Sequence, residues 1–425
     1  MQTMESIIEI HKNGQWIPAA EIRPAERHQA AFDYLPIYQF SENRSPISLA
    51  LPINNGRIGA DERGVPTCPS FMFDLVPQGL GRKYLLENMK MPDGDSMDIP
   101  LAQLGAFNPI GNLRLNTAVE YFNVWREDNA VMATEGFTQE QIVNRQEEFV
   151  NHIWLHAMLT AGTTGVQGAA PKFLLTQNSE GLWFADSALP DNEAVNHWLL
   201  KLPRGKTQAD LDVLRIEAIY LAIASDCGLR VEGNYYTKND MLFFERFDRK
   251  VKHGKTLRLH QESLISVAGI SGFPGGVSLF TLANAIAKYA THPAIEIAEF
   301  IKRELLNRAM GNTDNHGRNT AMQITEDGIV QLTPLYDFAP MFMDPELIAR
   351  SCRWVIEKRE LQKIVEIIEN INTTDDVKHQ VATNVEDFFE VLNGLEYLMR
   401  KHSLDKPVIE RLHHNIEATK EMLRG

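Results

Sequence analysis

The sequence predicts an α+β fold divided into several compact parts, and three observations lead to this prediction. Short apolar segments separated by proline and glycine fill residues 37–115, as in a region of short strands. Strand-like and helix-like segments alternate over residues 172–247, and the remainder of the chain is mostly helical in pattern. Because one hydrophobic core rarely serves more than about 250–300 residues, a chain of 425 residues is expected to contain more than one core.

Individual elements can be located from periodicity and from helix-capping residues. In the first region, residues 46–53 (PISLALPI) and 110–115 (IGNLRL) are expected to be strands. Thr138 followed by Gln141 is typical of a helix start. We therefore expect a helix over residues 138–159 that bridges two parts of the chain.

The middle region is expected to form a sheet with one packed helix. Strands are expected at 172–176, 197–203 and 241–247, with a helix at 210–229. A further helix is expected at 291–310, where one apolar stripe consists of Ala294, Ile297, Ile301, Leu305 and Ala309. The expected domains are 1–115, 116–247 and 248–425.

Charge and cysteine content exclude several classes of protein. The formal net charge is -14, from 42 basic and 56 acidic residues, so no direct nucleic-acid binding through a broad basic surface is expected. Cys68, Cys227 and Cys352 are too widely separated for a disulfide framework or a CxxC zinc site. The N-terminus lacks the features of a signal peptide, and no apolar stretch is long enough to span a membrane. We therefore expect a cytoplasmic protein with no membrane partner.

The segment GNTDNHGRNTAMQITEDGIVQLTPLYDF, residues 311–338, carries the clearest chemical signal. Gly311 follows the predicted helix and suits the left-handed turn that ends many helices. Asp314 and Asn319 then lie in a polar loop, before two strand-like pieces joined by residues 326–328. A second acid, Asp337, follows this predicted hairpin.

This pattern has the oxygen groups that phosphate transfer from ATP requires. Such transfer needs a group beside the attacking hydroxyl and oxygen ligands for Mg²⁺. Protein kinases use an aspartate, an asparagine five residues later and a second aspartate, and Asp314, Asn319 and Asp337 reproduce this order. The alternative is that these residues cluster because loops favour Asn, Asp and Gly. We favour the phosphotransferase interpretation, with ATP and Mg²⁺ as cofactors.

Upstream residues extend the same interpretation. Lys201 ends a strand-like segment and Glu217 lies in the following helix, as does the lysine–glutamate pair that holds ATP phosphates in kinases. Each could otherwise be a solvated surface charge. The glycine-containing segment 163–172 could cover phosphates with its backbone amides or be an ordinary turn. The apolar segment 243–247 could end in a hinge that contacts adenine or be a core strand.

Several phrases together resemble the HipA-type serine/threonine kinase toxins of bacterial toxin–antitoxin systems. These phrases, in the family's order, are PISLALP (46–52), GVQGAAPK (165–172), LLKLP (199–203), FFERFDR (243–249), GNTDNHGRN (311–319) and LTPLYDF (332–338). The resemblance covers most of the chain from about residue 35. It implies a bilobal protein-kinase-like fold with an N-terminal β-rich subdomain and a mostly helical C-terminal lobe.

The resemblance also implies roles for individual residues. Asp314 resembles the catalytic aspartate, and Asn319 and Asp337 resemble the Mg²⁺ ligands. The implied ATP-binding residues are Thr164, Gly165, Val166, Gln167, Lys172, Lys201, Glu245, Phe247, His316, Asn319, Tyr336 and Asp337. His316 could instead stabilise its loop.

Two residues depart from the family pattern. Gly162 replaces the loop serine of the family, so Thr163 or Thr164 would have to take any self-inactivating phosphate. Arg318 stands where lysine is frequent, and arginine and lysine side chains differ in geometry.

The family resemblance also implies partners: a protein substrate, in some members an aminoacyl-tRNA synthetase, and a helix-turn-helix antitoxin.

Two other functions stay open. Small-molecule kinases that act on aminoglycosides or choline share the Asp314–Asn319 spacing, although the ERFDR and GVQGAAPK phrases argue against them. A catalytically silent scaffold that binds nucleotide or a partner is the other alternative. The joint presence of Lys201, Asp314, Asn319 and Asp337 argues against such a loss of activity.

Overall fold

The computed structural model describes residues 5–24, 30–42, 44–53, 68–128, 135–146, 149, 171–186, 188–346 and 348–424. The chain divides into two compact units. The first comprises residues 1–202, 243–262 and 269–273, and the second comprises residues 203–242, 263–268 and 274–425. None of the described helices is long and apolar enough to cross a membrane.

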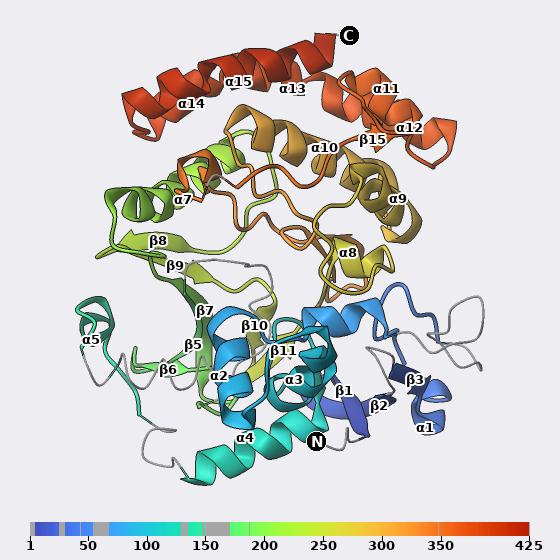
Figure 1. Ribbon diagram of the computed structural model, residues 1–425, viewed down its shortest axis with the longest axis vertical. Coiled ribbons are helices and arrows are strands. Elements are labelled where there is room, and N and C mark those ends of the chain that lie inside the picture. The colour runs from blue at the N-terminus through green and yellow to red at the C-terminus, as the bar shows by residue number, and fades with distance from the viewer. Residues whose placement is uncertain are drawn as a thin grey trace. The chain divides into compact units, whose positions relative to one another are not determined.

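An antiparallel sheet opens the first unit. Its strands are β1 (Ser6–Lys12), β2 (Gln15–Pro24), β3 (Ala30–Tyr34) and β4 (Leu113–Leu115), in the order β3-β2-β1-β4 (Figure 1). Asn13 and Gly14 join β1 to β2 with φ angles of 52° and 81°, the left-handed conformation of a tight two-residue hairpin turn. Ile8, Ile10 and Phe32 are buried in the core beneath this sheet.

In the described part of residues 37–115 the regular elements are mostly helices, so the expectation of short strands there is largely wrong. The elements are α1 (Pro36–Gln39), η1 (Ser70–Asp74), α2 (Gly79–Met89), η2 (Asp95–Met97) and α3 (Asp98–Gly105), followed by α4 (Asn116–Asp128). Proline does not prevent this, because Pro100 lies in the first turn of α3, where a missing N–H removes no helical hydrogen bond. Residues 110–115 contain β4 as predicted.

Residues 46–53 are also not a strand and form an isolated bridge between Ser48 and Leu51. Ser48 Oγ donates to Glu262 Oε1 at 2.6 Å, and Leu49 N donates to Glu262 Oε2 at 2.9 Å. The Tyr34 hydroxyl accepts from Ile47 N at 2.9 Å and donates to Leu51 O at 2.8 Å. Side chains therefore satisfy these backbone groups in place of a partner strand.

A second sheet contains the strands predicted for the middle region. β6 (Trp183–Ala185), β5 (Lys172–Asn178), β7 (Ala194–Lys201) and β9 (Met241–Glu245) lie in that order. The chain then forms β10 (Arg249–Lys252), β11 (Lys255–Arg258) and β12 (His260–Ser263). The expectation of a mostly helical pattern from residue 248 is therefore wrong for these residues.

The predicted helix start at Thr138 is confirmed. Thr138 caps α5 (Gln139–Val143), and its side chain and that of Gln141 form a reciprocal capping box. Most of the remaining expected helix, up to residue 159, lies outside the described residues.

A buried ion network joins three parts of the first unit. Arg246 donates to Asp186 Oδ2 from Nη1 at 2.8 Å and to Asp248 from Nε and Nη2 at 2.9 and 2.8 Å. Arg249 donates to Asp248 Oδ2 at 2.6 Å and to the carbonyl of Gly111 at 2.6 Å. Burial would raise the pKa of Asp248, but the two guanidinium charges outweigh it and lower that pKa below its usual range.

Replacing Asp248 with asparagine should lower the free energy of unfolding by about 3–5 kcal/mol, because two buried guanidinium groups lose their shared charge partner. Urea unfolding followed by circular dichroism measures this change. Asp240→Asn, in an exposed turn with φ 57°, is the matched control and should have little effect. A loss below about 1 kcal/mol in Asp248→Asn, within the range of exposed ion pairs, would contradict the expected role of the network.

The second unit is mostly helical. In chain order its elements are α7 (Gln208–Asp226), β8 (Tyr235–Lys238), α8 (Leu264–Val267), α9 (Leu279–Tyr289), α10 (Pro293–Ala309), β13 (Ala321–Ile324), β14 (Val330–Leu332), η4 (Met341–Met343), β15 (Val355–Ile356), β16 (Arg359–Glu360), α11 (Ile364–Glu369), α12 (Asp375–Glu386), α13 (Phe388–Asn393), α14 (Leu395–Lys401) and α15 (Lys406–Arg424). The C-terminal helices pack as an outer layer beside α10 (Figure 1). The apolar stripe predicted on α10 is confirmed, since all five of its residues are buried.

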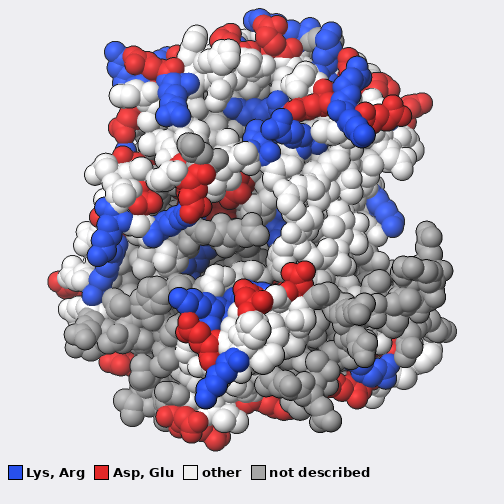
Figure 2. Space-filling view, viewed as in Figure 1, with Lys and Arg blue, Asp and Glu red and all other residues white. Residues whose placement is uncertain are grey.

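Charged side chains of both signs are interspersed on the face of the molecule shown in Figure 2. Basic residues that stand together there are accompanied by acidic ones among the described residues. The predicted absence of direct nucleic-acid binding stays a prediction.

Candidate functional site

The end of α10 fixes the start of the candidate catalytic loop. Gly311 has φ 67°, and its N–H donates to the carbonyl of Arg308, while Asn312 N donates to the carbonyl of Asn307. These are the two hydrogen bonds of a Schellman helix end. A Cβ atom at Gly311 would lie 2.6 Å from the Phe342 ring, so glycine is required by both conformation and space. The predicted helix-ending role of Gly311 is confirmed.

A hydrogen bond inside the loop orients Asn319. Its Nδ2 donates to the backbone carbonyl of Asp314 at 2.8 Å. Because a carbonyl can only accept, the amide nitrogen must face this group, and the orientation of the amide is fixed by chemistry. Asn319 is 9% exposed, and its Oδ1 atom is buried without a hydrogen-bond partner in the structure. A buried oxygen without a hydrogen-bond partner is suited to coordinate a cation.

Asp337 occupies an unusual backbone conformation directly after the predicted hairpin. β13 and β14 pair antiparallel as expected, and Gly328 has φ 78° in the turn between them. Asp337 has φ 51°, in the left-handed region that few residues other than glycine adopt. The next residue, Phe338, is buried against Tyr220, with ring centroids 5.2 Å apart.

Tyr220 also links this segment to the end of α10. Its hydroxyl donates to the carbonyl of Met310 at 2.8 Å, and burial raises the pKa of Tyr220, which keeps the hydroxyl protonated. Asn312 Nδ2 makes a long contact of 3.5 Å to the carbonyl of Asp337 and a shorter one of 2.9 Å to Asn307 Oδ1. The helix end and Asp337 are thus tied together within the second unit.

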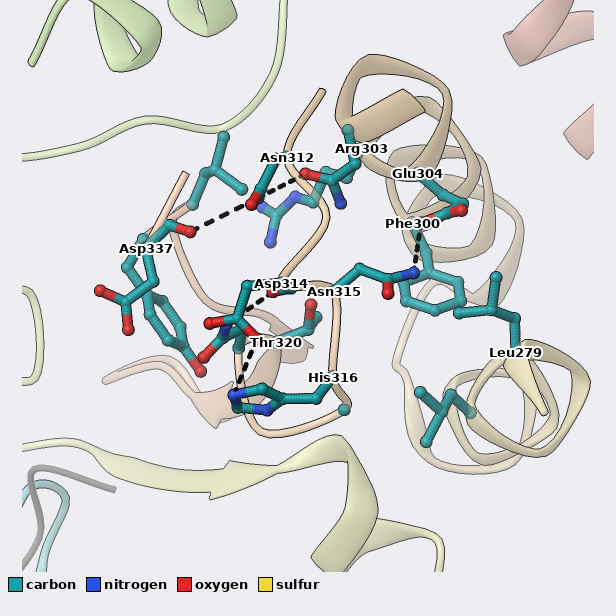
Figure 3. Close-up of a pocket in the computed structure, with 16 residues that line it drawn as sticks. Leu279, Phe300, Arg303, Glu304, Asn312, Asp314, Asn315, His316, Thr320 and Asp337 are labelled. Atoms are coloured by element: carbon teal, nitrogen blue, oxygen red, sulfur yellow. Dashed lines mark hydrogen bonds and ion pairs between the residues drawn. The ribbon is translucent and has the colours of Figure 1, made fainter. Parts of the chain in front are cut away.

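Five of the predicted residues line one pocket of the second unit: Asp314, His316, Asn319, Tyr336 and Asp337. Figure 3 shows Asp314 and Asp337 at one end of this pocket, away from the apolar Leu279 and Phe300. The pocket encloses about 20 Å³, and about 10–15 Å³ is enough for one water. It therefore has room for a water or a small ion.

His316 and Tyr336 contact the loop itself. His316 Nε2 lies 3.6 Å from Asp314 Oδ1 (Figure 3), and the Tyr336 hydroxyl donates to the carbonyl of Arg318 at 2.8 Å. The first contact leaves both the nucleotide role and the loop-stabilising alternative for His316 open.

Six further polar residues of the pocket had no assigned role in the sequence: Arg303, Glu304, Asn307, Asn312, Asn315 and Thr320. Asn315 donates to the carbonyl of Cys352 at 2.8 Å, accepts from its N–H at 3.3 Å and also donates to Glu304 Oε2 at 3.3 Å. Asn312 and Asn315 both lie in the GNTDNHGRN phrase, so this phrase could have indicated them as pocket residues. Nothing in the sequence indicated Glu304, because a charged residue on a helix is usually expected at the surface.

The predicted nucleotide residues of the first unit are placed as follows. Lys172 begins β5 and Lys201 ends β7, and the two are paired in register across these strands. Glu245 ends β9, and the ring centroid of Phe247 lies 6.3 Å from that of Phe244. Thr164, Gly165, Val166 and Gln167 lie outside the described residues, as do Gly162 and Thr163.

Glu217, in the second unit, is buried on α7, so its alternative as a solvent-facing acid is wrong.

The donor set of the pocket fits magnesium better than a transition metal. Among the described residues, no group of three or more His, Cys, Asp or Glu side chains is arranged to hold a metal ion. Mg²⁺ is typically held by one or two carboxylates, with phosphate and water oxygens completing its shell. Asp337 and the unpaired Asn319 oxygen match that chemistry.

Comparison with known protein families gives two matches that together span much of the chain. A family model described as HipA-like C-terminal domain matches residues 164–393, and one described as HipA N-terminal domain matches residues 10–116. A Sinorhizobium fredii (strain NBRC 101917 / NGR234) protein named "Putative kinase Y4mE" is 25% identical over 199 residues. This alignment covers 44% of the chain and 44% of that protein, so the chain spans less than half of this curated relative.

Solved structures support the fold. HipA from the Shewanella oneidensis MR-1 toxin–antitoxin system, solved with HipB and operator DNA, matches with a TM-score of 0.65 at 18% identity, over 98% of this chain and 96% of that chain. The chain therefore shares that fold. The Helicobacter pylori proinflammatory kinase CtkA matches with a TM-score of 0.34 at 15% identity, over 53% of this chain and 87% of that chain.

Proposed function

Because this chain belongs to the HipA-like family, we propose that it is an ATP-dependent serine/threonine protein kinase. It transfers the γ-phosphate of ATP to a protein hydroxyl. The observation that carries this proposal is the meeting of Asp314, Asn319 and Asp337 in one pocket, with the Asn319 oxygen buried and unpaired. If these polar residues only stabilised the loop, the buried Asn319 oxygen would be expected to have a hydrogen-bond partner.

Each residue of the pocket has a distinct part in the proposed reaction. Asp314 orients the attacking hydroxyl and accepts its proton, which is the role of the kinase catalytic-loop aspartate. Asp337 and Asn319 would hold Mg²⁺, which supplies neutralisation of phosphate charge when bound. The hydrogen bond from Asn319 to the Asp314 carbonyl fixes the relative position of these two residues.

Paired lysines support the proposed ATP site on the first unit. Lys172 and Lys201 lie opposite each other on β5 and β7, so their side chains leave the same face of the sheet. We assign the phosphates of ATP to this face, with Thr164, Gly165, Val166 and Gln167 beside them and Glu245 and Phe247 at adenine.

Lys201→Ala should raise the ATP concentration for half-maximal rate by roughly 10–100-fold, since a hydrogen bond to a charged group contributes about 1.5–3 kcal/mol. Initial rates at varied ATP and fixed Mg²⁺ measure this shift. Lys206→Ala, which removes an exposed lysine nearby in the sequence, is the control and should match the wild type. An unchanged ATP dependence in a folded Lys201→Ala protein would remove Lys201 from the ATP site.

The organisation and partners belong to the same proposal. We assign an N-terminal subdomain to residues 1–115, the ATP-binding lobe to 116–247 and the catalytic lobe to 248–425. A cytoplasmic toxin of this kind inhibits growth and pairs with a small helix-turn-helix antitoxin, as the solved HipA is found with HipB. Its target is a protein, with aminoacyl-tRNA synthetases as the first class to test and Thr163 or Thr164 as self-modification sites.

Two measurements test the proposal. Purified protein is incubated with labelled ATP, first with cell lysate and then with a panel of aminoglycosides and choline. Label on a protein supports the proposal, whereas label on metabolites alone would favour a small-molecule kinase. Mg²⁺-dependent ATP binding with no transfer would favour a silent scaffold. Phosphoproteomics of cells that express the wild type or Asp314→Ala then identifies the target.

A further inference from the structure

The segment that leads into Asp337 is held by charged side chains. Glu296 Oε2 accepts from Leu332 N at 2.8 Å, and Arg230 Nη1 donates to Leu332 O at 2.6 Å. Arg303 Nη2 donates to the carbonyl of Thr333 at 2.8 Å. Backbone groups just before Asp337 are thus bonded to three side chains.

These side chains form two ion pairs that are joined by a hydrogen bond from the backbone of Arg230. Arg230 binds both carboxylate oxygens of Glu296, at 2.9 and 3.0 Å. Arg303 binds Glu299 Oε1 through Nε at 2.9 Å, and that same oxygen accepts from Arg230 N at 3.0 Å. Glu296, Glu299 and Arg303 are all buried on α10, although the apolar stripe of this helix is formed by other residues.

Packing alone does not account for this network. Buried ion pairs are often no more stabilising than well-packed apolar residues of similar volume. An apolar side chain, however, cannot donate to the carbonyl of Thr333 or accept from the N–H of Leu332. The network therefore supplies directed hydrogen bonds to a segment that ends in Asp337, whose φ of 51° needs support from its surroundings.

We propose that Arg303, held by Glu299, is a positioning residue that fixes the carboxylate of Asp337 for cation binding. Figure 3 shows Arg303 reaching from α10 into the pocket that Asp337 also lines. This inference rests on the proposed function, because it assigns Asp337 to a Mg²⁺ ion. Groups of this kind act through the ligand they orient, and their loss typically weakens metal affinity by about 10–100-fold.

Arg303→Lys is the sharpest variant. It keeps the charge beside Glu299, so the protein should fold, but an ammonium group cannot reproduce the planar fork that bonds both Glu299 and Thr333. The readout is Mn²⁺ binding to the full chain, with a non-hydrolysable ATP analogue, followed by electron paramagnetic resonance. The expected result is about a tenfold loss of Mn²⁺ affinity, with a native circular-dichroism spectrum and a cooperative urea transition. Wild-type Mn²⁺ affinity in Arg303→Lys would overturn the inference.

A double variant and a control separate positioning from stability. Glu299→Gln with Arg303→Met removes both charges together and should fold, yet it should still bind Mn²⁺ weakly. Wild-type affinity in this variant would also overturn the inference. Lys302→Gln removes the neighbouring charge, which lies on the Phe388 side of α10, and should bind Mn²⁺ as the wild type does. A wild type that binds no Mn²⁺ would overturn the proposed function together with this inference.

Discussion

Asp337→Asn is expected to reduce phosphate transfer by more than about 100-fold, beyond the roughly 10–100-fold that loss of an outer residue around a metal costs. The change removes a carboxylate charge that Mg²⁺ prefers among its ligands. Asparagine is a better choice than alanine here, because it tolerates the left-handed region and should keep the φ of 51° observed at Asp337. Steady-state transfer to the protein target, with varied Mg²⁺, measures the loss.

Two controls make this result specific. Asp327→Asn removes the same charge from the exposed turn between β13 and β14 and should leave transfer unchanged. The urea midpoint of Asp337→Asn should stay near that of the wild type. Near-normal turnover in a folded Asp337→Asn protein would remove Asp337 from the site.

Asp314→Ala is expected to lower transfer by about 10²–10⁴-fold, the usual contribution of a positioned general base. The loss should be chemical, because the group that Asn319 binds is the backbone carbonyl of Asp314, which alanine retains. ATP binding and thermal stability should therefore persist. Any growth inhibition by the expressed wild type should disappear in the variant.

Two results would contradict the catalytic role proposed for Asp314. A variant that fails to fold would assign Asp314 to the structure of the loop. Transfer within about threefold of the wild type would rule out general-base catalysis by Asp314, since that contribution is typically at least about 100-fold. Either result would restore the explanation that the loop is polar because loops favour such residues.

The pocket was predictable because its determinants are local in sequence. Residues 311–338 encode a helix end at Gly311, a polar loop and a hairpin with Gly328, and all three appear in the structure. Short-range signals of this kind specify where Asp314, Asn319 and Asp337 fall. Their chemical roles were inferred from spacing and resemblance, and they stay predictions.

The incorrect predictions of secondary structure and burial have a different origin. Apolar segments with proline within residues 37–115 fit short strands and short helices equally. In the structure α2 and α3 pack against each other and α3 packs against α4, contacts that local sequence does not reveal. The hairpin of β10 and β11 was hidden in a basic, polar stretch with a His253–Gly254 turn. The charged residues of α10 were unpredictable, because their burial depends on Arg230 and Thr333, which are distant in sequence.

The buried network of Arg246, Asp248 and Arg249 has a consequence for how catalytically inactive relatives of this protein should be identified. These residues belong to the phrase ERFDR, one of the most recognisable in the chain, yet their bonds go to Asp186, Pro109 and Gly111 within the first unit. Selection on stability alone would preserve them in a descendant that had lost catalysis. Arg246, Asp248 and Arg249 are therefore expected to persist without catalysis, and inactive descendants should be sought by substitutions at Asp314 or Asp337 in chains that keep these three residues.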